Sequence, residues 1–243
     1  MSLRIAVINL QSGIGVTRGY SQYLTRGWRY LLPHHGLPIE EAAAFLASEQ
    51  VDIALLTEVE GGSRRSRYLS HLAILSERTG LLHTKFFSTR SHGEIINEGN
   101  AVLSRIPILS TTAHPLTKST NPRVLGVSVV QLENSTLSVC VVHLALRARA
   151  RLAQLQELVG LLTKLDGPII LAGDFNERDH AAFDVLKAIG LTPMSVPTFP
   201  SWKPRHALQV LFVSSHLRVI SISAPTHSPF SDHLPLLLEV EAA

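Results

Sequence analysis

The amino-acid sequence predicts an α/β fold in which two mixed β-sheets pack face to face and helices cover the outside. Nine short segments rich in Val, Ile and Leu, most of them bounded by Gly, Pro, Asn or Ser, have the composition of strands. Four segments with the spacing or composition of helices lie between them. Strands that alternate with helices, together with one short turn between adjacent strands, predict both parallel and antiparallel pairs.

The expected strands span residues 3–9, 51–58, 100–106, 124–133, 137–143, 168–172, 207–214, 217–223 and 235–240. Asn134, Ser135 and Thr136 join two of these segments and predict a hairpin, which requires antiparallel pairing.

The expected helices span residues 38–50, 66–80, 148–165 and 178–190. Pro38 and Glu40 suit the first turn of a helix, and Gly80 suits a C-cap. Arg147, Arg149 and Arg151 alternate at the start of the third helix, where we expect a solvated face.

Composition indicates an ordinary globular protein, with 45% hydrophobic and 17% charged residues among 243. No repeat, low-complexity linker or break in composition divides the chain, so we expect residues 1–243 to form one domain. A net charge of +3 is compatible with an anionic substrate but is small for a dedicated nucleic-acid binder.

The chain contains one cysteine, Cys140, so an intramolecular disulfide is excluded, and its apolar surroundings predict a small buried side chain. No window reaches the ~18 uncharged apolar residues that a membrane span requires. The apolar start of the chain is too short for the core of a signal peptide. We therefore expect a cytoplasmic protein.

Polar side chains lie at the ends of five apolar segments, where a buried scaffold meets a loop and where sites are usually built. These residues are Asn9, Glu58, His143, Asp174 with Asn176, and Asp232 with His233. Five such ends, all carrying carboxylates, amides or imidazoles, are hard to explain by chance and predict a shared site.

Asp174 and Asn176 are two residues apart, so in an extended segment they project to the same side. Gly173 leaves space beside them, and Phe175 points away into packing. A carboxylate and an amide then face one ligand. The alternative is a turn or helix N-cap, which Asp and Asn also favour.

Glu58 ends a strand that is apolar on both faces, and a carboxylate there needs a cation. Mg²⁺ typically takes one or two carboxylates and fills its remaining positions with water and phosphate. The alternative is an ion pair with Arg64, Arg65 or Arg67. Neither the spacing of a zinc site nor a G-x-S-x-G nucleophile motif is present.

In this order along the chain, these segments resemble the endonuclease/exonuclease/phosphatase superfamily. The matching residues are Asn9; Thr57-Glu58-Val59; Gly99-Asn100 through Arg105; Val142-His143-Leu144; Gly173-Asp174-Phe175-Asn176; and Ser231-Asp232-His233. Each motif is short, but the ordered set extends from Asn9 to His233. The resemblance implies a four-layered α/β sandwich.

The resemblance also implies roles. The implied ligands of Mg²⁺, with Mn²⁺ as the alternative ion, are Glu58, Asn9 and Asp232. Asp174 would orient or deprotonate the attacking water, and three residues would bind the phosphate and stabilise its charge: Asn176, His143 and His233. We expect two further substrate contacts, from Asn100 and from Arg123, which opens a strand near the site.

One position departs from the family pattern, which has Asp where this chain has Gln209. In relatives that Asp orients the histidine corresponding to His233 and stabilises its charged form. Gln can accept a hydrogen bond and so preserve orientation, but it supplies no charge. Amidating the comparable Asp of the serine-protease triad costs ~10⁴ in rate.

The segment from Tyr20 to His35 gathers four aromatic residues and two arginines just after Asn9. Such a segment can stack on bases, can contact a lipid interface, or can fold as an apolar loop onto the edge of a sheet.

These observations predict a metal-dependent phosphoesterase that acts on a phosphodiester or phosphomonoester. Nucleic acid, a membrane lipid head group and a small phosphorylated molecule all stay open as substrates, and no obligate protein partner is inferred. Gln209 motivates a second hypothesis, an impaired relative that binds a phosphorylated ligand without turnover. A third is an unrelated α/β protein with coincidental motifs.

Overall fold

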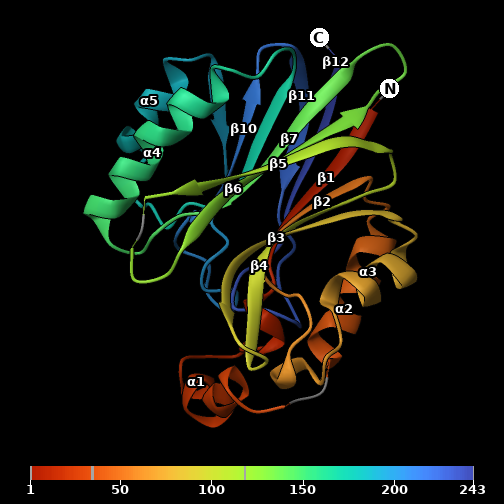
Figure 1. Cartoon of the computed structure of the whole chain (residues 1–243), viewed down its shortest axis with the longest axis vertical. Helices are drawn as coiled ribbons and strands as arrows, with labels where there is room; N and C mark the ends of the chain where they lie inside the picture. Colours follow the sequence, from red (N-terminus) through yellow and green to blue (C-terminus); the bar gives the residue numbers. More distant parts are fainter. Residues whose placement is uncertain (1, 34–35, 118, 243) are drawn as a thin grey trace.

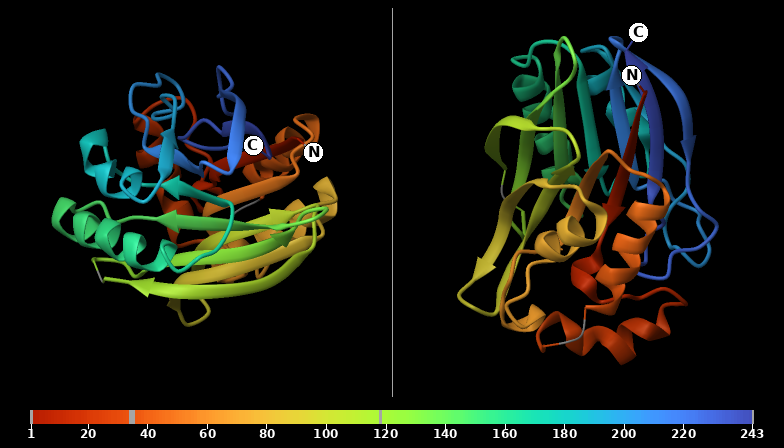
Figure 2. Two further views of the ribbon diagram at one scale, coloured as in Figure 1. Left: turned by 90° about the horizontal axis from the view of Figure 1, so that it is seen from above. Right: turned by 90° about the vertical axis from the view of Figure 1, so that its right-hand side faces the viewer.

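Two six-stranded mixed sheets pack face to face in the computed structural model, which describes residues 2–33, 36–117 and 119–242 (Figure 1). His34 and His35, the end of the aromatic segment, lie outside the described residues. Helices cover the outer face of each sheet, so the predicted α/β sandwich is confirmed (Figure 2).

The first sheet has the order β11-β12-β1-β2-β4-β3. Its strands are β1 (Ser2–Asn9), β2 (Ile53–Glu60), β3 (His83–His92), β4 (Ile96–Ser104), β11 (Leu217–Ser223) and β12 (Leu236–Ala242). The central strands β1 and β2 are parallel, and their neighbours pair antiparallel.

The second sheet has the order β5-β6-β7-β8-β10-β9. Its strands are β5 (Ile108–Leu116), β6 (Arg123–Gln131), β7 (Thr136–His143), β8 (Ile169–Asp174), β9 (Leu191–Met194) and β10 (Gln209–Ser214). Here the central parallel pair is β7 and β8. The predicted hairpin joins β6 and β7, which pair antiparallel.

The helices lie mainly in the connections that cross over between parallel strands. The α-helices are α1 (Ser21–Arg26), α2 (Leu37–Ser48), α3 (His71–Thr79), α4 (Ala148–Leu162) and α5 (Asp184–Lys187). The 3-10 turns are η1 (Gln11–Gly13), η2 (Gly27–Tyr30), η3 (Arg64–Ser66) and η4 (His180–Phe183). None of the described helices is long and apolar enough to cross a membrane.

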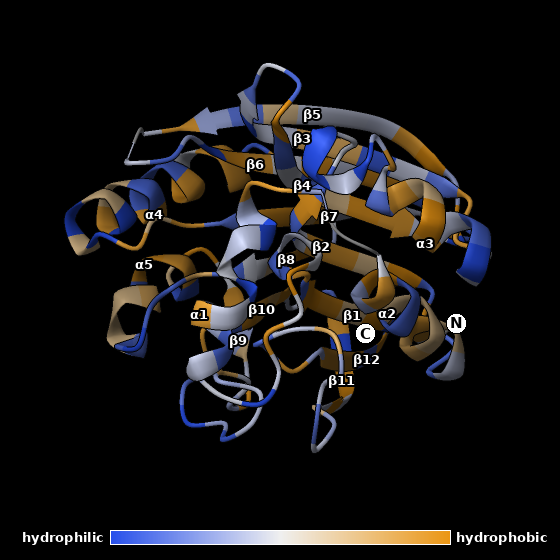
Figure 3. Cartoon of the chain, turned by 90° about the horizontal axis from the view of Figure 1, so that it is seen from below, coloured by the Kyte–Doolittle hydropathy of each residue, from blue (hydrophilic) through white to orange (hydrophobic). Residues whose placement is uncertain are grey.

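Three apolar clusters hold the layers together. One fills the space between the two sheets, a second packs α2 and α3 on the first sheet, and a third packs α4 and α5 on the second. The inner strands are accordingly the most hydrophobic part of the chain (Figure 3). Cys140 lies in the third cluster and is buried, as predicted.

Three strands were not predicted. β3 and β5 lie at sheet edges and carry mostly exposed or half-buried side chains, so they lack the continuous apolar run of the inner strands. β9 has only four residues. The expected helix at 178–190 is instead two short turns, η4 and α5.

Candidate active site

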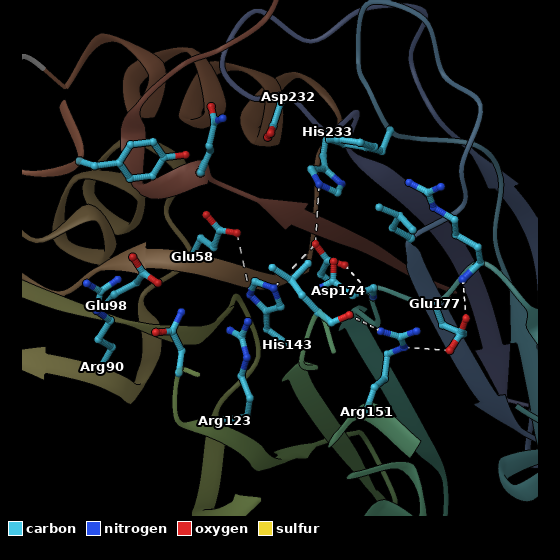
Figure 4. A pocket seen from close by; sticks show the side chains of 18 of the residues that line it. Glu58, Arg90, Glu98, Arg123, His143, Arg151, Asp174, Glu177, Asp232 and His233 are labelled. Carbon is cyan, nitrogen blue, oxygen red and sulfur yellow. Dashed lines mark hydrogen bonds and ion pairs between the residues drawn. The ribbon is translucent and has the colours of Figure 1, made fainter. Parts of the chain in front are cut away.

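A cavity of about 650 Å³ lies where the central strands of both sheets end (Figure 4). Its lining includes most of the predicted site residues: Glu58, Arg123, His143, Asp174, Asn176, Asp232 and His233. Figure 4 shows these side chains, where labelled, turned toward one space from both sheets.

The parallel strand pairs explain why distant residues meet here. Parallel strands run in the same direction, so their carboxyl ends lie at the same edge of a sheet, where sites of α/β proteins are usually built. Asn9 pairs with Thr57 at the end of β1 and β2, and His143 pairs with Asp174 at the end of β7 and β8. Packing of the sheets then brings the two pairs of ends together.

Gly173 permits close contact of β8 with β7. Its φ is +148°, and a Cβ atom there would lie 1.8 Å from the backbone oxygen of Val142. Only glycine suits both conditions. The approach fixes Asp174 beside His143.

The Asp174 carboxylate is surrounded by donors. Asn9 Nδ2 donates to Oδ2 at 3.1 Å, and the Asn176 backbone N–H donates to Oδ1 at 3.0 Å. The Nε2 atoms of His233 and His143 lie 3.7 Å and 4.0 Å from Oδ2. This carboxylate is therefore oriented by hydrogen bonds from two directions and flanked by two imidazoles.

Asn9 stands between two carboxylates. Its Nδ2 also donates to Glu58 Oε1 at 3.1 Å, while its Oδ1 accepts from the backbone N–H of Gln11 at 2.9 Å. The amide oxygen accepts this one hydrogen bond and keeps a second lone pair. The structure places Asn9 as a donor that bridges Glu58 and Asp174, and its role as a metal ligand stays a prediction.

Glu58 has φ +52° at an irregularity in the pairing of β2 with β4, a conformation uncommon for non-glycine residues. Burial, together with the negative charges of Glu98 and Asp232, raises its pKa to about 8. Among the described residues no arginine pairs with Glu58, because Arg65 contacts Glu60 and Glu98 instead. The described residues therefore show no ion pair of Glu58 with Arg64, Arg65 or Arg67, while His143 Nδ1 lies 4.0 Å from Glu58 Oε1.

The cavity's carboxylates suit a hard divalent cation. Glu58, Glu98, Asp174 and Asp232 line it together, and mutual repulsion is one cause of the raised Glu58 pKa. In the described chain no group of three or more His, Cys, Asp or Glu side chains is placed to hold a metal ion by itself. A cation held by Glu58 and Asp232 would therefore take further oxygens from water and a phosphate, as Mg²⁺ commonly does.

Asp232 is held by the hydroxyl group of Tyr23. Tyr23 Oη in α1 donates to its Oδ2, and burial and the Asp232 charge raise the Tyr23 pKa, so the phenol stays protonated. Ser231 Oγ lies 3.3 Å from Oδ1 but gives its single proton to the Asn9 carbonyl at 2.6 Å, which ties the final loop to the end of β1.

Gln209 contacts the end of β1 rather than His233. Its Oε1 accepts from the Asn9 N–H at 3.0 Å, and its Nε2 donates to the Leu234 carbonyl at 2.8 Å and to Thr198 Oγ1 at 3.1 Å. His233 Nδ1 is buried and has no hydrogen-bond partner within the described chain. Within the described chain His233 therefore does not donate to Gln209, the hydrogen bond by which a glutamine here could have preserved its orientation.

His143 and Asn176 complete the predicted set. Burial and the positive charge of Arg123 lower the pKa of His143 to about 4, although Asp174 and Glu98 oppose this, so the ring is neutral near pH 7. Asn176 has φ +52° and donates from Nδ2 to the Leu144 carbonyl at 3.0 Å. Both residues line the cavity, and Phe175 packs away from it, as predicted.

The two predicted substrate contacts have different places. Arg123 lines the cavity, is mostly buried, and its Nε has no hydrogen-bond partner in the described residues. Asn100 is buried and does not belong to the described lining; its Nδ2 donates to the Val124 carbonyl at 3.2 Å. Its amide thus holds the start of β6, next to Arg123, instead of facing a substrate.

Sequence reasoning missed several lining residues, including Tyr23, Tyr30, Arg90, Glu98 and Glu177. The two tyrosines lie in the aromatic segment, which was the available signal. Glu98 directly precedes the Gly99-Asn100 motif and accepts from Ser12 Oγ and Arg65, both at 2.9 Å.

Arg151 corrects the expectation of a wholly solvated arginine face on α4. Arg147 and Arg149 are exposed, but Arg151 is buried at the cavity, and its Nε donates to Glu177 Oε2 at 2.8 Å. The alternating spacing carried no information on which arginine turns inward.

Comparison with known proteins gives one family and many similar folds. The profile of the endonuclease/exonuclease/phosphatase family matches residues 9–233. No curated protein matches by sequence.

Three solved structures illustrate the likeness of fold. An endonuclease/exonuclease/phosphatase from Beutenbergia cavernae has a TM-score of 0.78 at 18% identity, covering 100% of this chain and 72% of that one. The human Nocturnin catalytic domain with bound sulfate has a TM-score of 0.72 at 20% identity, covering 100% and 94%. A mannosyl-6-phosphatase from Bacteroides thetaiotaomicron has a TM-score of 0.69 at 16% identity, covering 98% and 99%.

Proposed function

Because the chain belongs to the endonuclease/exonuclease/phosphatase family, whose members hydrolyse phosphoester bonds, we propose that it is a Mg²⁺-dependent phosphoesterase acting on a phosphodiester or phosphomonoester. One observation carries the proposal. A carboxylate oriented by two amide donors, Asp174, lies between two imidazoles and faces the same cavity as Glu58, which has no cationic partner among the described arginines and lysines.

Each side chain has a chemical task in this proposal. Asp174 accepts a proton from the attacking water, since Asn9 and Asn176 hold its oxygens toward the cavity. The neutral ring of His143 and the charged guanidinium of Arg123 provide hydrogen-bond donors for the phosphate oxygens. His233 lines the same cavity from the loop before β12. Glu58 and Asp232 would hold the divalent ion, which neutralises charge that develops on the phosphate.

The test is hydrolysis of bis-p-nitrophenyl phosphate and p-nitrophenyl phosphate with Mg²⁺ or Mn²⁺, before and after EDTA. We expect EDTA to abolish turnover and Asp174→Asn to lower kcat about 10²- to 10⁴-fold, the usual contribution of a general base. Asp166→Asn, an exposed aspartate away from the cavity, is the matched control and should retain wild-type rates. Turnover that survives both EDTA and Asp174→Asn would contradict the proposal.

A second candidate function is binding of a phosphorylated ligand without turnover. The buried His233 Nδ1 favours it, because that atom has no partner among the described residues and Gln209 brings no charge to it. Background rates with every metal and substrate, together with measurable affinity for a phosphate ester, would support this candidate over the first.

A further inference from the structure

The helical segment formed by α1 and η2 presents its apolar side to solvent. Tyr20, Leu24, Trp28 and Leu31 follow one another at spacings of four, four and three, which places them on one side of a helical stretch. Their exposed fractions are 63, 88, 47 and 63%. Leu32, directly after them, is also more than half exposed.

Other side chains hold the segment to the body of the protein by polar contacts. Tyr23 donates to Asp232, Arg26 donates to the Gly15 carbonyl, and Arg29 donates to the Ile14 carbonyl at 2.8 Å. No residue of α1 or η2 is fully buried. A surface helix ordinarily turns its apolar stripe to the core, so this arrangement is the reverse of the usual one and marks an interaction surface.

Positive charge gathers next to the apolar stripe. A second cavity, of about 590 Å³, lies beside the segment and is lined by Arg18, Arg26, Arg29, Trp28 and His227. Glu41 is the only acid among its described lining residues. Arg29 Nε is buried without a hydrogen-bond partner in the described chain. An anionic group would supply what this cavity lacks.

We propose that the α1–η2 segment is a docking surface for anionic phospholipid bilayers, with the apolar stripe in the interface and the arginine cavity against the lipid phosphates. Exposed Leu and Trp beside clustered Arg are what an interfacial helix uses. Nucleic acid fits less well, because Leu24, Leu31 and Leu32 offer no ring on which a base can stack. Tyr23 and Tyr30 of this segment line the catalytic cavity, so docking would set its mouth at the membrane surface.

The experiment measures sedimentation of the full chain with vesicles of phosphatidylcholine alone or with roughly one third phosphatidylglycerol. We expect binding only to the anionic vesicles, weakening as salt is raised. Leu24→Glu with Leu31→Glu should weaken binding about tenfold or more, and Arg18→Gln about fivefold. Leu82→Glu, an equally exposed leucine between α3 and β3, is the matched control and should bind as wild type.

A second readout uses Trp28 itself. With Trp202→Phe, which keeps the aromatic edge against Tyr20, Trp28 is the remaining tryptophan. Its emission should shift to the blue on anionic vesicles and be quenched by spin-labelled acyl chains. Both readouts are independent of the proposed hydrolysis, so either inference can fail alone.

Several results would overturn the proposal. Wild-type protein that ignores anionic vesicles, or a double glutamate variant that binds as tightly as wild type, would do so. A dimer that the double variant converts to monomer, without any vesicle binding, would assign the stripe to a second copy. Binding to single-stranded oligonucleotides in place of vesicles would assign it to nucleic acid.

Discussion

Gln209 shows how one side chain can serve the site while leaving its neighbour without a partner. Its amide satisfies the Asn9 N–H, the Leu234 carbonyl and Thr198 Oγ1, all at the junction of the two sheets. Asn9 in turn bridges the Glu58 and Asp174 carboxylates. Gln209 therefore positions the acids through the backbone of Asn9, and His233 Nδ1 receives nothing from it.

Gln209→Asp tests two effects of Gln209, its contribution to stability and the absence of a negative charge beside His233. The shorter acid has no donor for the buried Leu234 carbonyl, so we expect the free energy of unfolding in urea to fall by about 1–3 kcal/mol. A carboxylate near His233 should also raise kcat by about tenfold or more, within the ~10⁴ range of the serine-protease comparison.

Gln156→Asp, at an exposed position of α4, is the control and should change stability by no more than about 0.5 kcal/mol. An unchanged or lower kcat for Gln209→Asp would mean that the missing charge does not limit the rate.

At the scale of elements, Arg151 fastens the start of α4 to the loop after β8. Its guanidinium donates to Glu177 and to the carbonyls of Ala145 and Leu146. Burial alone would raise the Glu177 pKa, but hydrogen bonds from Arg151 and from the backbone N–H groups of Asp179 and Arg178 outweigh it, and the pKa lies below its usual value. The ionised form therefore stabilises the fold.

The contribution of the ionised Glu177 carboxylate to stability should be visible in how the stability of Glu177→Gln, compared with wild type, changes with pH. A carboxyl whose folded pKa is lowered adds stability above its unfolded pKa and loses it as pH falls through the folded value. Near pH 7 we expect the variant to be about 1–3 kcal/mol less stable than wild type in urea. The difference should shrink as pH falls below the unfolded pKa of about 4.3 and disappear once pH is below the folded value.

Glu133→Gln, at an exposed position, should match wild type across the range. A difference between wild type and Glu177→Gln that stays constant with pH would show that shape, not charge, is responsible.

At the scale of the whole molecule, the site exists only because two sheets meet. The first sheet contributes Asn9, Glu58 and Glu98, and the second contributes His143 and Asp174. The distance between these two groups of residues depends on how the sheets pack, and the side chains between the sheets are closely packed. A Cβ atom on Gly126 of β6 would lie 2.3 Å from the ring of Phe87 in β3.

Gly126→Ala should therefore destabilise the protein by about 1–3 kcal/mol through overpacking. Combined with Phe87→Leu, which makes room, the loss should be at least ~0.5 kcal/mol smaller than the sum of the two single changes. Both values come from urea unfolding.

Gly160→Ala on α4 is the matched control, because nothing lies within 4 Å of its added Cβ. There we expect unchanged or higher stability, since Ala favours a helix over Gly. If the losses of stability from Gly126→Ala and Phe87→Leu simply add, the packing of Gly126 against Phe87 does not restrict how closely the two sheets approach.

The amino-acid sequence was sufficient to predict the fold class, the inner strands and the residues that end those strands. Buried strands need continuous apolar runs, so a polar residue that ends such a run is easy to recognise in the sequence. The edge strands β3 and β5 were not predicted, because many of their side chains face solvent and the strands therefore lack a continuous apolar run.

Tertiary structure alone decided which atoms face each other. That Asn9 donates to two carboxylates, that Asn100 turns to Val124 and that Arg151 turns inward depends on contacts across sheets and loops. The same holds for Gln209, whose partners lie on three other segments. Hydrogen bonds are directional and short, so residue type and spacing give a site its members, and only packing assigns each member its partner.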